Sequence, residues 1–284
     1  MSPIRFYLST IFLSTVSFAQ INVKKVTTNL SQDYQSVAVW QNADKEFSVS
    51  LMAQPMVTPK PKQTSVANVF VTALHDGKNL ALRLRWSDPQ INDSDKLKSY
   101  SDAVAVQFPI NDNLQPPAVI MGHQGNPVHI FHWRYQYQMD VKQGSKREIQ
   151  QIYPNMTVDM YPQDYKFTGN IPKATQEQKD AFLGGTAAGN PKSYYKPQGI
   201  DELMAEGFST TVTRPNPQAS AFGVWENNEW KVYILRPLKY QDGSSLQEGG
   251  KSHVAFAVWQ GENEEVGGMK SLTMAWTPLL LMER

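Results

Sequence analysis

The sequence predicts a mainly β fold, an antiparallel β-sandwich with a few short helices in a long inserted loop region. Apolar and polar residues alternate with period two in many short segments, and turn-forming residues separate these segments. The chain has 284 residues, 40% of them hydrophobic, and no cysteine. This length allows one large β domain with a substantial core, so the fold does not need disulfides.

The alternating segments follow one another along most of the chain. Leu80, Leu82, Leu84 and Trp86 mark one face of a return strand after a turn at residues 75–78. In chain order we expect strands at residues 68–74, 80–86, 102–108, 127–133, 230–237, 253–259 and 271–282. Many short strands with turns between them are typical of a sandwich or barrel.

Residues 134–219 lack this periodicity and are rich in Pro, Gly, Gln and Tyr. Two short helices are expected within them. Residues 175–178 have the Thr-x-x-Gln form of a capping box, and residues 200–206 end at Gly207. A connection of this length is usually functional or covers another part of the fold.

The N-terminus resembles an export signal. Arg5 precedes an uncharged apolar and small-residue stretch that ends in Ser-Phe-Ala19. We expect residues 1–19 to be a cleaved signal peptide, residues 20–65 a lead-in packed on the sandwich, and residues 66–284 the main domain. Loss of Arg5 changes the formal charge from +1 to zero. No later run reaches the length of a membrane-spanning helix, so no span is expected in the mature chain.

Composition excludes several classes of function. Lys and Arg total 27 and Asp and Glu total 26, which gives no support for binding nucleic acid or an anionic membrane. Without cysteine there is no cysteinyl zinc or iron–sulfur site, no thiol nucleophile and no covalently attached c-type haem. Any redox or metal chemistry must therefore use His, Met, Lys, Tyr or carboxylates.

Enzyme motifs are missing from the sequence. There is no Gly-x-Ser-x-Gly elbow, phosphate-binding glycine loop, His-Glu-x-x-His or calcium loop. His129 and His132 are three apart on an expected strand and so point to opposite faces. His75 is expected to be solvated in a turn, and His253 to be a surface residue or a satisfied polar group rather than a ligand. An enzyme acting through His129, His132 and nearby carboxylates remains a minor alternative.

The segment 116–133 is the most informative. Met121 and Gly122 end an apolar run before a loop, and glycine allows the backbone to approach a ligand closely. A thioether at this place can lie against a flat ligand. The alternative is that Met121 fills the core, as most methionines do.

Five further blocks follow in order, at residues 190–192, 200–209, 230–238, 254–261 and 267–271. Together with the Met121 segment they make the chain resemble the haem b-binding domain of the gamma subunits of ethylbenzene dehydrogenase and dimethylsulfide dehydrogenase. The resemblance covers roughly Val66 to the C-terminus.

The resemblance implies a periplasmic β-sandwich that holds one non-covalent haem b, with a methionine and a lysine as axial ligands of the iron. Met121 matches the methionine and Lys270 the lysine, with Lys239 as a rival for Lys270. His123 stands where an acidic residue is expected and could replace a ligand. A thioether favours ferrous iron, and a lysine binds iron only as the neutral amine. Arg236 could pair with a haem propionate or form a surface salt bridge.

Three tryptophans, Trp133, Trp259 and Trp276, could line the haem pocket or belong to the core. With both axial positions filled by protein, electron transfer is favoured over catalysis. The implied partners are a molybdopterin-containing catalytic subunit, an iron–sulfur subunit, and a soluble cytochrome or other carrier. The alternative function is an exported β-sandwich ligand- or carbohydrate-binding module without a cofactor, and only the blocks around Met121 and Lys270 separate the two.

Overall fold

The computed structural model describes residues 19–93, 96–111, 115–147, 149–153 and 184–283. The signal peptide expected up to residue 19 lies almost entirely outside these residues, as does the helix expected at 175–178.

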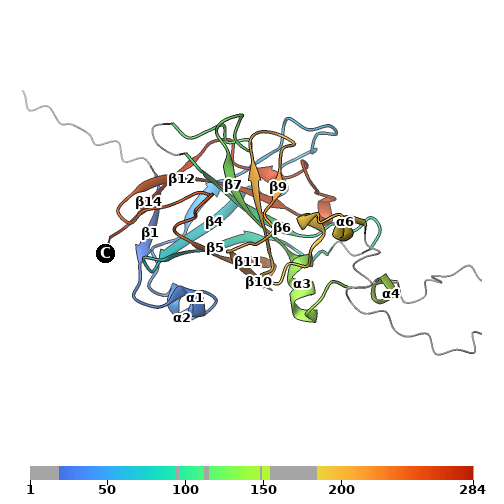
Figure 1. Ribbon diagram of the computed structural model, residues 1–284, viewed down its shortest axis with the longest axis horizontal. Coiled ribbons are helices and arrows are strands. Elements are labelled where there is room, and N and C mark those ends of the chain that lie inside the picture. The colour runs from blue at the N-terminus through green and yellow to red at the C-terminus, as the bar shows by residue number, and fades with distance from the viewer. Residues whose placement is uncertain (1–18, 94–95, 112–114, 148, 154–183, 284) are drawn as a thin grey trace, which may run out of the picture.

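Strands dominate the described part of the chain (Figure 1). Fourteen of them form one curled sheet there, with β10, β11, β5, β4, β1, β14, β12, β6, β7, β8 and β9 side by side in that order. Their bounds are β1 Ile21–Lys25, β2 Phe47–Ser50, β3 Met52–Ala53, β4 Asn68–His75, β5 Asn79–Ser87, β6 Ala103–Pro109, β7 Val128–Arg134, β8 Ile200–Ala205, β9 Val212–Thr213, β10 Ser220–Glu226, β11 Glu229–Pro237, β12 Lys251–Trp259, β13 Ser271–Leu272 and β14 Thr277–Leu281.

The sheet turns back on itself at β12. Residues 251–254 of this strand pair with β14, whereas residues 255–259 pair with β6. The two halves of the sheet therefore face each other, which confirms the predicted β-sandwich. The strand pairs are antiparallel except at β1, which runs parallel to both β4 and β14.

The core lies between the two halves and takes every second residue from their strands. Side chains from β4, β5 and β11 meet those of β6, β7 and β12 in one cluster. Trp86, Trp133 and Trp230 are fully buried within it, with ring centroids 5.0 to 6.5 Å apart. Rings of this size supply a large part of the apolar area that stabilises the sandwich.

Short helices cover the outer face of the first half. Leu30 of α1 (Leu30–Asp33) and Trp40 of α2 (Val37–Trp40) pack in a second cluster with Leu74 and Ala81. The other described helices are α3 Tyr135–Gln143, α4 Ile149–Ile152, α6 Gly184–Ala187, and the 3₁₀ turns η1 Pro191–Ser193 and η2 Gly261–Asn263. None of these described helices is long and apolar enough to cross a membrane.

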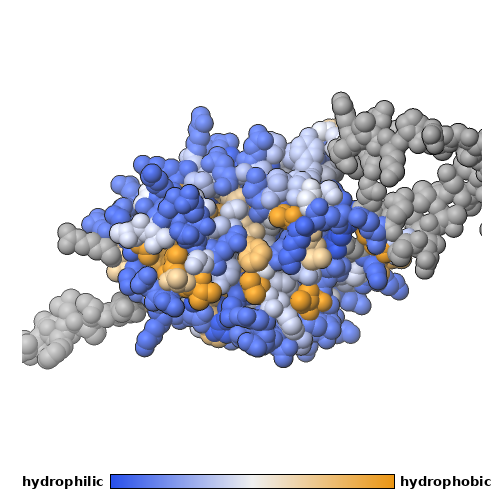
Figure 2. Space-filling model, turned by 90° about the horizontal axis from the view of Figure 1, so that it is seen from below, coloured by the Kyte–Doolittle hydropathy of each residue, from blue (hydrophilic) through white to orange (hydrophobic). Residues whose placement is uncertain are grey.

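Figure 2 shows a largely hydrophilic surface from below, with hydrophobic side chains in small separate patches.

Two predictions for secondary structure were wrong. Residues 200–205 form strand β8 rather than a helix, because Ile200 and Glu202 face the core while Asp201 and Leu203 face the outer side, and β7 supplies the pairing. Residues 271–282 form two strands, β13 and β14, instead of one. The N-terminal segment 20–65 contributes β1, β2, β3 and both helices α1 and α2.

His75 is also placed differently from the prediction. It ends β4 and is fully buried, with Nε2 2.6 Å from the carbonyl oxygen of Met282. The turn begins only after His75, and the C-terminal segment covers its side chain.

Candidate functional site

A pocket of about 370 Å³ lies on the outer face of the second half of the sheet. Its floor is formed by β6, β7, β8 and β12, on the side opposite the core. Three loops form the walls, at residues 119–121, 208–211 and 267–270. The pocket volume falls in the range of small-molecule and cofactor sites.

Small side chains make the floor flat. The strand register places Ala257 of β12 beside Ala105 of β6, and Ala105 beside His132 of β7. Ala255 lies in the neighbouring row. On the same strands, the residues between these alanines are large and face the core. The alternation of small and large residues therefore leaves room on one face and fills the other.

Met121 occupies a strained turn at the edge of the pocket. Its φ is +67°, in the left-handed region that non-glycine residues rarely adopt, and Gly122 follows with φ +74°. The Met121 carbonyl accepts a hydrogen bond of 2.7 Å from Gly207, and Gln107 donates one of 2.8 Å to the carbonyl of Val119. These bonds fix the loop, so the Met121 side chain has a defined direction into the pocket.

Lys270 comes from the opposite wall, directly before β13. Its carbonyl accepts a hydrogen bond of 3.0 Å from Gln54, and its Nζ lies 4.7 Å from the centre of the Trp259 ring. No carboxylate forms an ion pair with Lys270 within the described residues. Burial lowers the pKa of Lys270 to about 8, so the neutral amine is accessible close to physiological pH.

His132 and Trp259 complete the lower part of the pocket. Their rings lie 4.8 Å apart at 34°, and Trp259 donates a hydrogen bond of 3.0 Å to the carbonyl of Gly267. His132 is 8% exposed, and its Nε2 has no hydrogen-bond partner among the described residues. Burial lowers the pKa of His132 well below its usual value, and the nearby positive charge of Arg134 adds to this.

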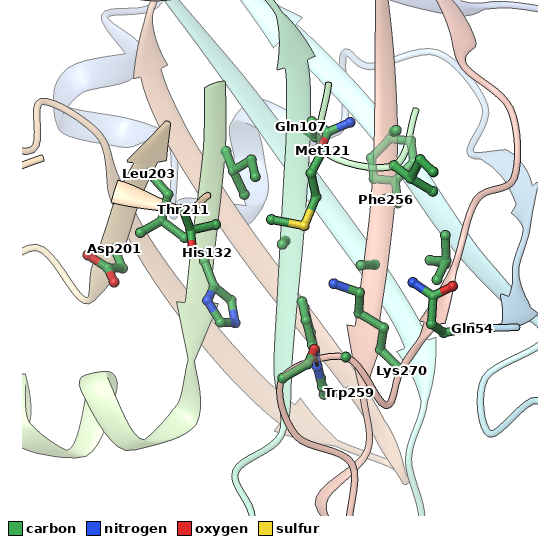
Figure 3. A pocket seen from close by; sticks show the side chains of 18 of the residues that line it. Gln54, Gln107, Met121, His132, Asp201, Leu203, Thr211, Phe256, Trp259 and Lys270 are labelled. Carbon is green, nitrogen blue, oxygen red and sulfur yellow. Dashed lines mark hydrogen bonds between the residues drawn. The ribbon is translucent and has the colours of Figure 1, made fainter. Parts of the chain in front are cut away.

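The structure therefore brings together three of the five residues predicted for the site. Figure 3 shows the sulfur of Met121, the amine of Lys270 and the ring of Trp259 around one space, with His132 beside them. The chemistry of this donor set is a thioether, an amine with a lowered pKa and a neutral imidazole. Such donors suit a soft or borderline metal centre with a flat apolar ligand frame.

Arg236, predicted to pair with a haem propionate or to form a surface salt bridge, lies away from the pocket. This residue is fully buried on the core face of β11, in line with Val232 and Ile234, and it does not line the pocket. Its guanidinium donates to Ser244 Oγ at 2.7 Å and lies 4.8 Å from the ring of Phe108. Burial lowers the pKa of Arg236 to about 10.

Other candidates also lie outside the pocket wall. Trp133 is part of the core and contacts Gly223, and Trp276 donates a hydrogen bond of 2.6 Å to the carbonyl of Pro117. Lys239 is exposed. His123 is exposed, and its ring nitrogens are within hydrogen-bond distance of the Ala118 amide and the Asn126 side chain.

His129 belongs to a separate buried network. It lies on the opposite face of β7 from His132, as predicted, with Nε2 3.0 Å from Glu202 and Nδ1 3.2 Å from Ser244 Oγ. The order Ser–His–Glu is that of a catalytic triad, but all three residues are 0% exposed and no described pocket reaches them. The network joins β7 and β8 to the segment after β11 inside the fold. Among the described residues no group of three His, Asp or Glu side chains could hold a metal ion.

Sequence reasoning missed part of the pocket. The floor alanines were visible as alternating Ala and Val in the two strands, Asp-Ala-Val-Ala-Val and Val-Ala-Phe-Ala-Val. Arg134, Lys192 and Phe208 on the wall gave no such signal, because their place depends on how loops and strand ends meet in space.

Fold and pocket together define a β-sandwich domain with a ligand site on the outer face of one sheet half. The chain belongs to the ethylbenzene dehydrogenase family, whose model matches residues 37–271. The resemblance stated from the sequence blocks is thereby confirmed.

Relatives of the chain are named as subunits of larger enzymes. The gamma subunit of chlorate reductase from Ideonella dechloratans is 25% identical over 85% of this chain and 77% of its own length. A putative respiratory nitrate reductase heme subunit of Haloferax mediterranei is 21% identical over 89% and 70%. The gamma subunit of dimethylsulfide dehydrogenase from Rhodovulum sulfidophilum is 23% identical over 81% and 69%.

Solved structures with a similar chain path have a lower sequence identity to this chain than the relatives above. A family 9 carbohydrate-binding module from Caldicellulosiruptor kristjanssonii, in complex with cellotriose, has 10% identity and a TM-score of 0.42 over 93% of this chain and 94% of its own. A putative carbohydrate-binding protein from Bacteroides uniformis has 8% identity and a TM-score of 0.45 over 93% and 98%. Likenesses this distant carry no functional argument.

Proposed function

We propose that this protein is an electron-transfer subunit that holds one non-covalent haem b in the pocket on the outer face of β6, β7 and β12. Met121 and Lys270 are the proposed axial ligands. One observation carries the proposal: two side chains of the types that ligate haem iron, from loops far apart in the sequence, face one apolar pocket. The heme subunit among the relatives supports the choice of cofactor.

The residues present fit this group. The alanine floor offers a flat apolar surface, and the hydrogen-bonded loops hold Met121 and Lys270 in place before any ligand arrives. Because burial lowers the pKa of Lys270 to about 8, the amine gives up its proton at a small cost. When bound, the haem would supply a centre that accepts and releases one electron.

Occupation of both axial positions by protein leaves no open position for oxygen or a substrate. The proposed subunit therefore passes electrons and does no substrate chemistry itself. By analogy with the gamma subunits among the relatives, we propose a molybdopterin-containing catalytic subunit and an iron–sulfur subunit as partners, with a soluble cytochrome or other carrier as the further electron partner. The signal-like N-terminus supports export to the periplasm as part of the proposal.

The test is an absorption spectrum of the full chain produced with haem available. We expect a Soret band, sharp α and β bands on reduction, and release of the haem into acidic organic solvent because no covalent bond holds it. A folded protein that stays colourless and cannot be reconstituted would contradict the proposal and favour a cofactor-free binding module.

Single substitutions test the ligand pair. Met121→Leu and Lys270→Gln should each remove one axial bond and shift the spectrum from the six-coordinate to the five-coordinate form. Lys239→Gln is the matched control, since it removes an exposed lysine outside the pocket. If Met121→Leu and Lys270→Gln both keep the parent spectrum, the assigned pair is wrong.

A further inference from the structure

His132 is a buried polar side chain with unused hydrogen-bonding capacity at one end of the pocket. It is 8% exposed, and its Nε2 has no partner among the described residues. An unpaired buried ring nitrogen costs free energy unless a ligand completes its hydrogen bond. The imidazole is neutral, because burial lowers its pKa well below the usual value. A neutral imidazole carries one N–H donor for such a ligand.

Positive charge gathers around this imidazole. Arg134 is two residues further along β7, on the same face of the strand, and it also lines the pocket. Lys192 of η1 lines the same end. Neither Arg134 nor Lys192 forms an ion pair with a carboxylate within the described residues. The guanidinium of Arg134 instead lies 5.6 Å from the centre of the Tyr137 ring.

The acidic group on this wall is already neutralised. Asp201 is directly opposite His132 on β8, and its Oδ1 lies 2.9 Å from Nζ of Lys196. Both partners are buried, which strengthens their attraction. Arg134 and Lys192 therefore give this end of the pocket a net positive charge, next to an imidazole whose Nε2 has no partner among the described residues.

We propose that His132, Arg134 and Lys192 form a carboxylate-binding end of the pocket, which orients the ligand by its acidic edge. This inference rests on the proposed function, in which the ligand is haem b and the carboxylates are its two propionates. His132, Arg134 and Lys192 take the role considered for Arg236 in the sequence, because the guanidinium of Arg236 lies in the core. Planar, multidentate donors such as arginine are the preferred partners of carboxylates.

The experiment compares two porphyrins, haemin and its dimethyl ester, which differ only in the charge and hydrogen-bonding of the carboxylates. Haem-free protein is titrated with each, and affinity is read from Soret absorbance and tryptophan fluorescence. We expect the wild type to prefer haemin about tenfold or more. Arg134→Gln and His132→Phe should each lower this preference several-fold, since phenylalanine keeps the ring contact with Trp259 but has no N–H.

Lys192→Gln and Lys239→Gln form a matched pair, because each removes one exposed lysine and only Lys192 lines the pocket. Lys192→Gln should lower the preference for haemin and Lys239→Gln should leave it unchanged. Equal binding of both porphyrins by the wild type would overturn this inference alone. An altered axial spectrum in His132→Phe would overturn it too, because His132 would then be an iron ligand. Binding of neither porphyrin would overturn the proposed function and this inference with it.

Discussion

Met121 is held in an unfavourable backbone conformation at the point where its side chain is needed. A left-handed φ at a non-glycine residue costs free energy, and such strain is often found at functional sites. Gly122 makes the turn possible. A Cβ on Gly122 would lie 2.6 Å from the carbonyl oxygen of Asn126, so only glycine fits beside the returning chain.

Gly122→Ala should therefore destabilise the protein more than Gly125→Ala, which serves as its matched control. Both glycines have a positive φ, +74° and +81°, but a Cβ on Gly125 would meet nothing within 4 Å. We expect a loss of about 1 kcal/mol in the free energy of unfolding for Gly125→Ala. The clash at Gly122 should add roughly 1–3 kcal/mol. Chemical denaturation measures both, and equal losses would show that the turn has room for a methyl group.

Arg236 illustrates how a charged residue can be structural. Its guanidinium donates to the side chain and carbonyl of Ser244 and to the carbonyl of Pro237, and it stacks among three aromatic rings. Arg236→Met should lower the free energy of unfolding by roughly 2–3 kcal/mol, because these buried acceptors lose their donor. It should leave the haem spectrum unchanged. A loss of haem with an unchanged unfolding midpoint would place Arg236 in the cofactor site after all.

At the scale of single elements, the side chains of β6 have two roles. Those on one face of the strand fill the core, and those on the other face line the pocket. Val104, Val106 and Phe108 belong to the core, whereas Ala105 and Gln107 line the pocket. All seven residues of the strand are buried, because the pocket loops cover the face that is usually open to water in an antiparallel sheet.

Two substitutions on neighbouring residues of β6 should have opposite effects. Ala105→Leu extends into the pocket, so it should abolish or strongly reduce haem binding and leave the unfolding midpoint nearly unchanged. Val106→Ala leaves a cavity in the core, so it should cost roughly 2–3 kcal/mol of stability and keep haem binding. Soret titration and thermal unfolding of both variants give the comparison. Normal haem binding by Ala105→Leu would show that the ligand does not lie on this alanine floor.

Much of the β architecture was predictable, because β4, β5, β6, β7, β11 and β12 carry clear alternation in the sequence. β8 was not, since Glu, Leu, Met and Ala favour a helix locally and only its pairing with β7 makes it a strand. Arg134 and Arg236 show the limit for the site. Arg134 is the last residue of β7 and Arg236 the last but one of β11. The face that each side chain occupies follows from the strand register and from which half of the sheet covers the core, and the local sequence encodes neither.

At the scale of the whole molecule, two buried carboxyl groups join several elements at one end of the sandwich. Asp102, directly before β6, accepts hydrogen bonds from Trp230 on β11 and from the amides of Asn92 and Gly261. Asp88 follows β5 and is fully buried. Burial raises the pKa of Asp88 to about 6. Burial, followed by the charge of Asp88, raises that of Asp102 to about 7.

These shifts give stability a definite pH dependence. The ordinary pKa of both groups is 3.8, so between about pH 4 and pH 7 the folded protein keeps protons that the unfolded chain has lost. Their contribution to the free energy of unfolding is highest at or below pH 4, falls as the pH rises to 7, and is constant above that. Asp88→Asn removes one of the two groups and lowers the pKa of the other.

We therefore expect Asp88→Asn to lose less stability than the wild type between pH 5 and pH 8, by about 1–3 kcal/mol. The measurement is chemical denaturation of both proteins at both pH values, with Asp242→Asn as a control because Asp242 is exposed and its pKa is lowered. Parallel curves for the wild type and Asp88→Asn would mean that the buried pair stays charged in the folded state.

The parallel strand β1 has a consequence for when the protein folds. On the main path through the described sheet, β4 is linked to β12 through the neighbours β1 and β14, and β2, β3 and β13 form a second, shorter link. Among the described strands, β1 comes first in the chain and β14 comes last. The pairing of β1 with β14 can therefore form only after residues 277–281 have been synthesised. Because this join forms late, it would not hinder threading of the chain through a translocation channel, as the proposed export requires.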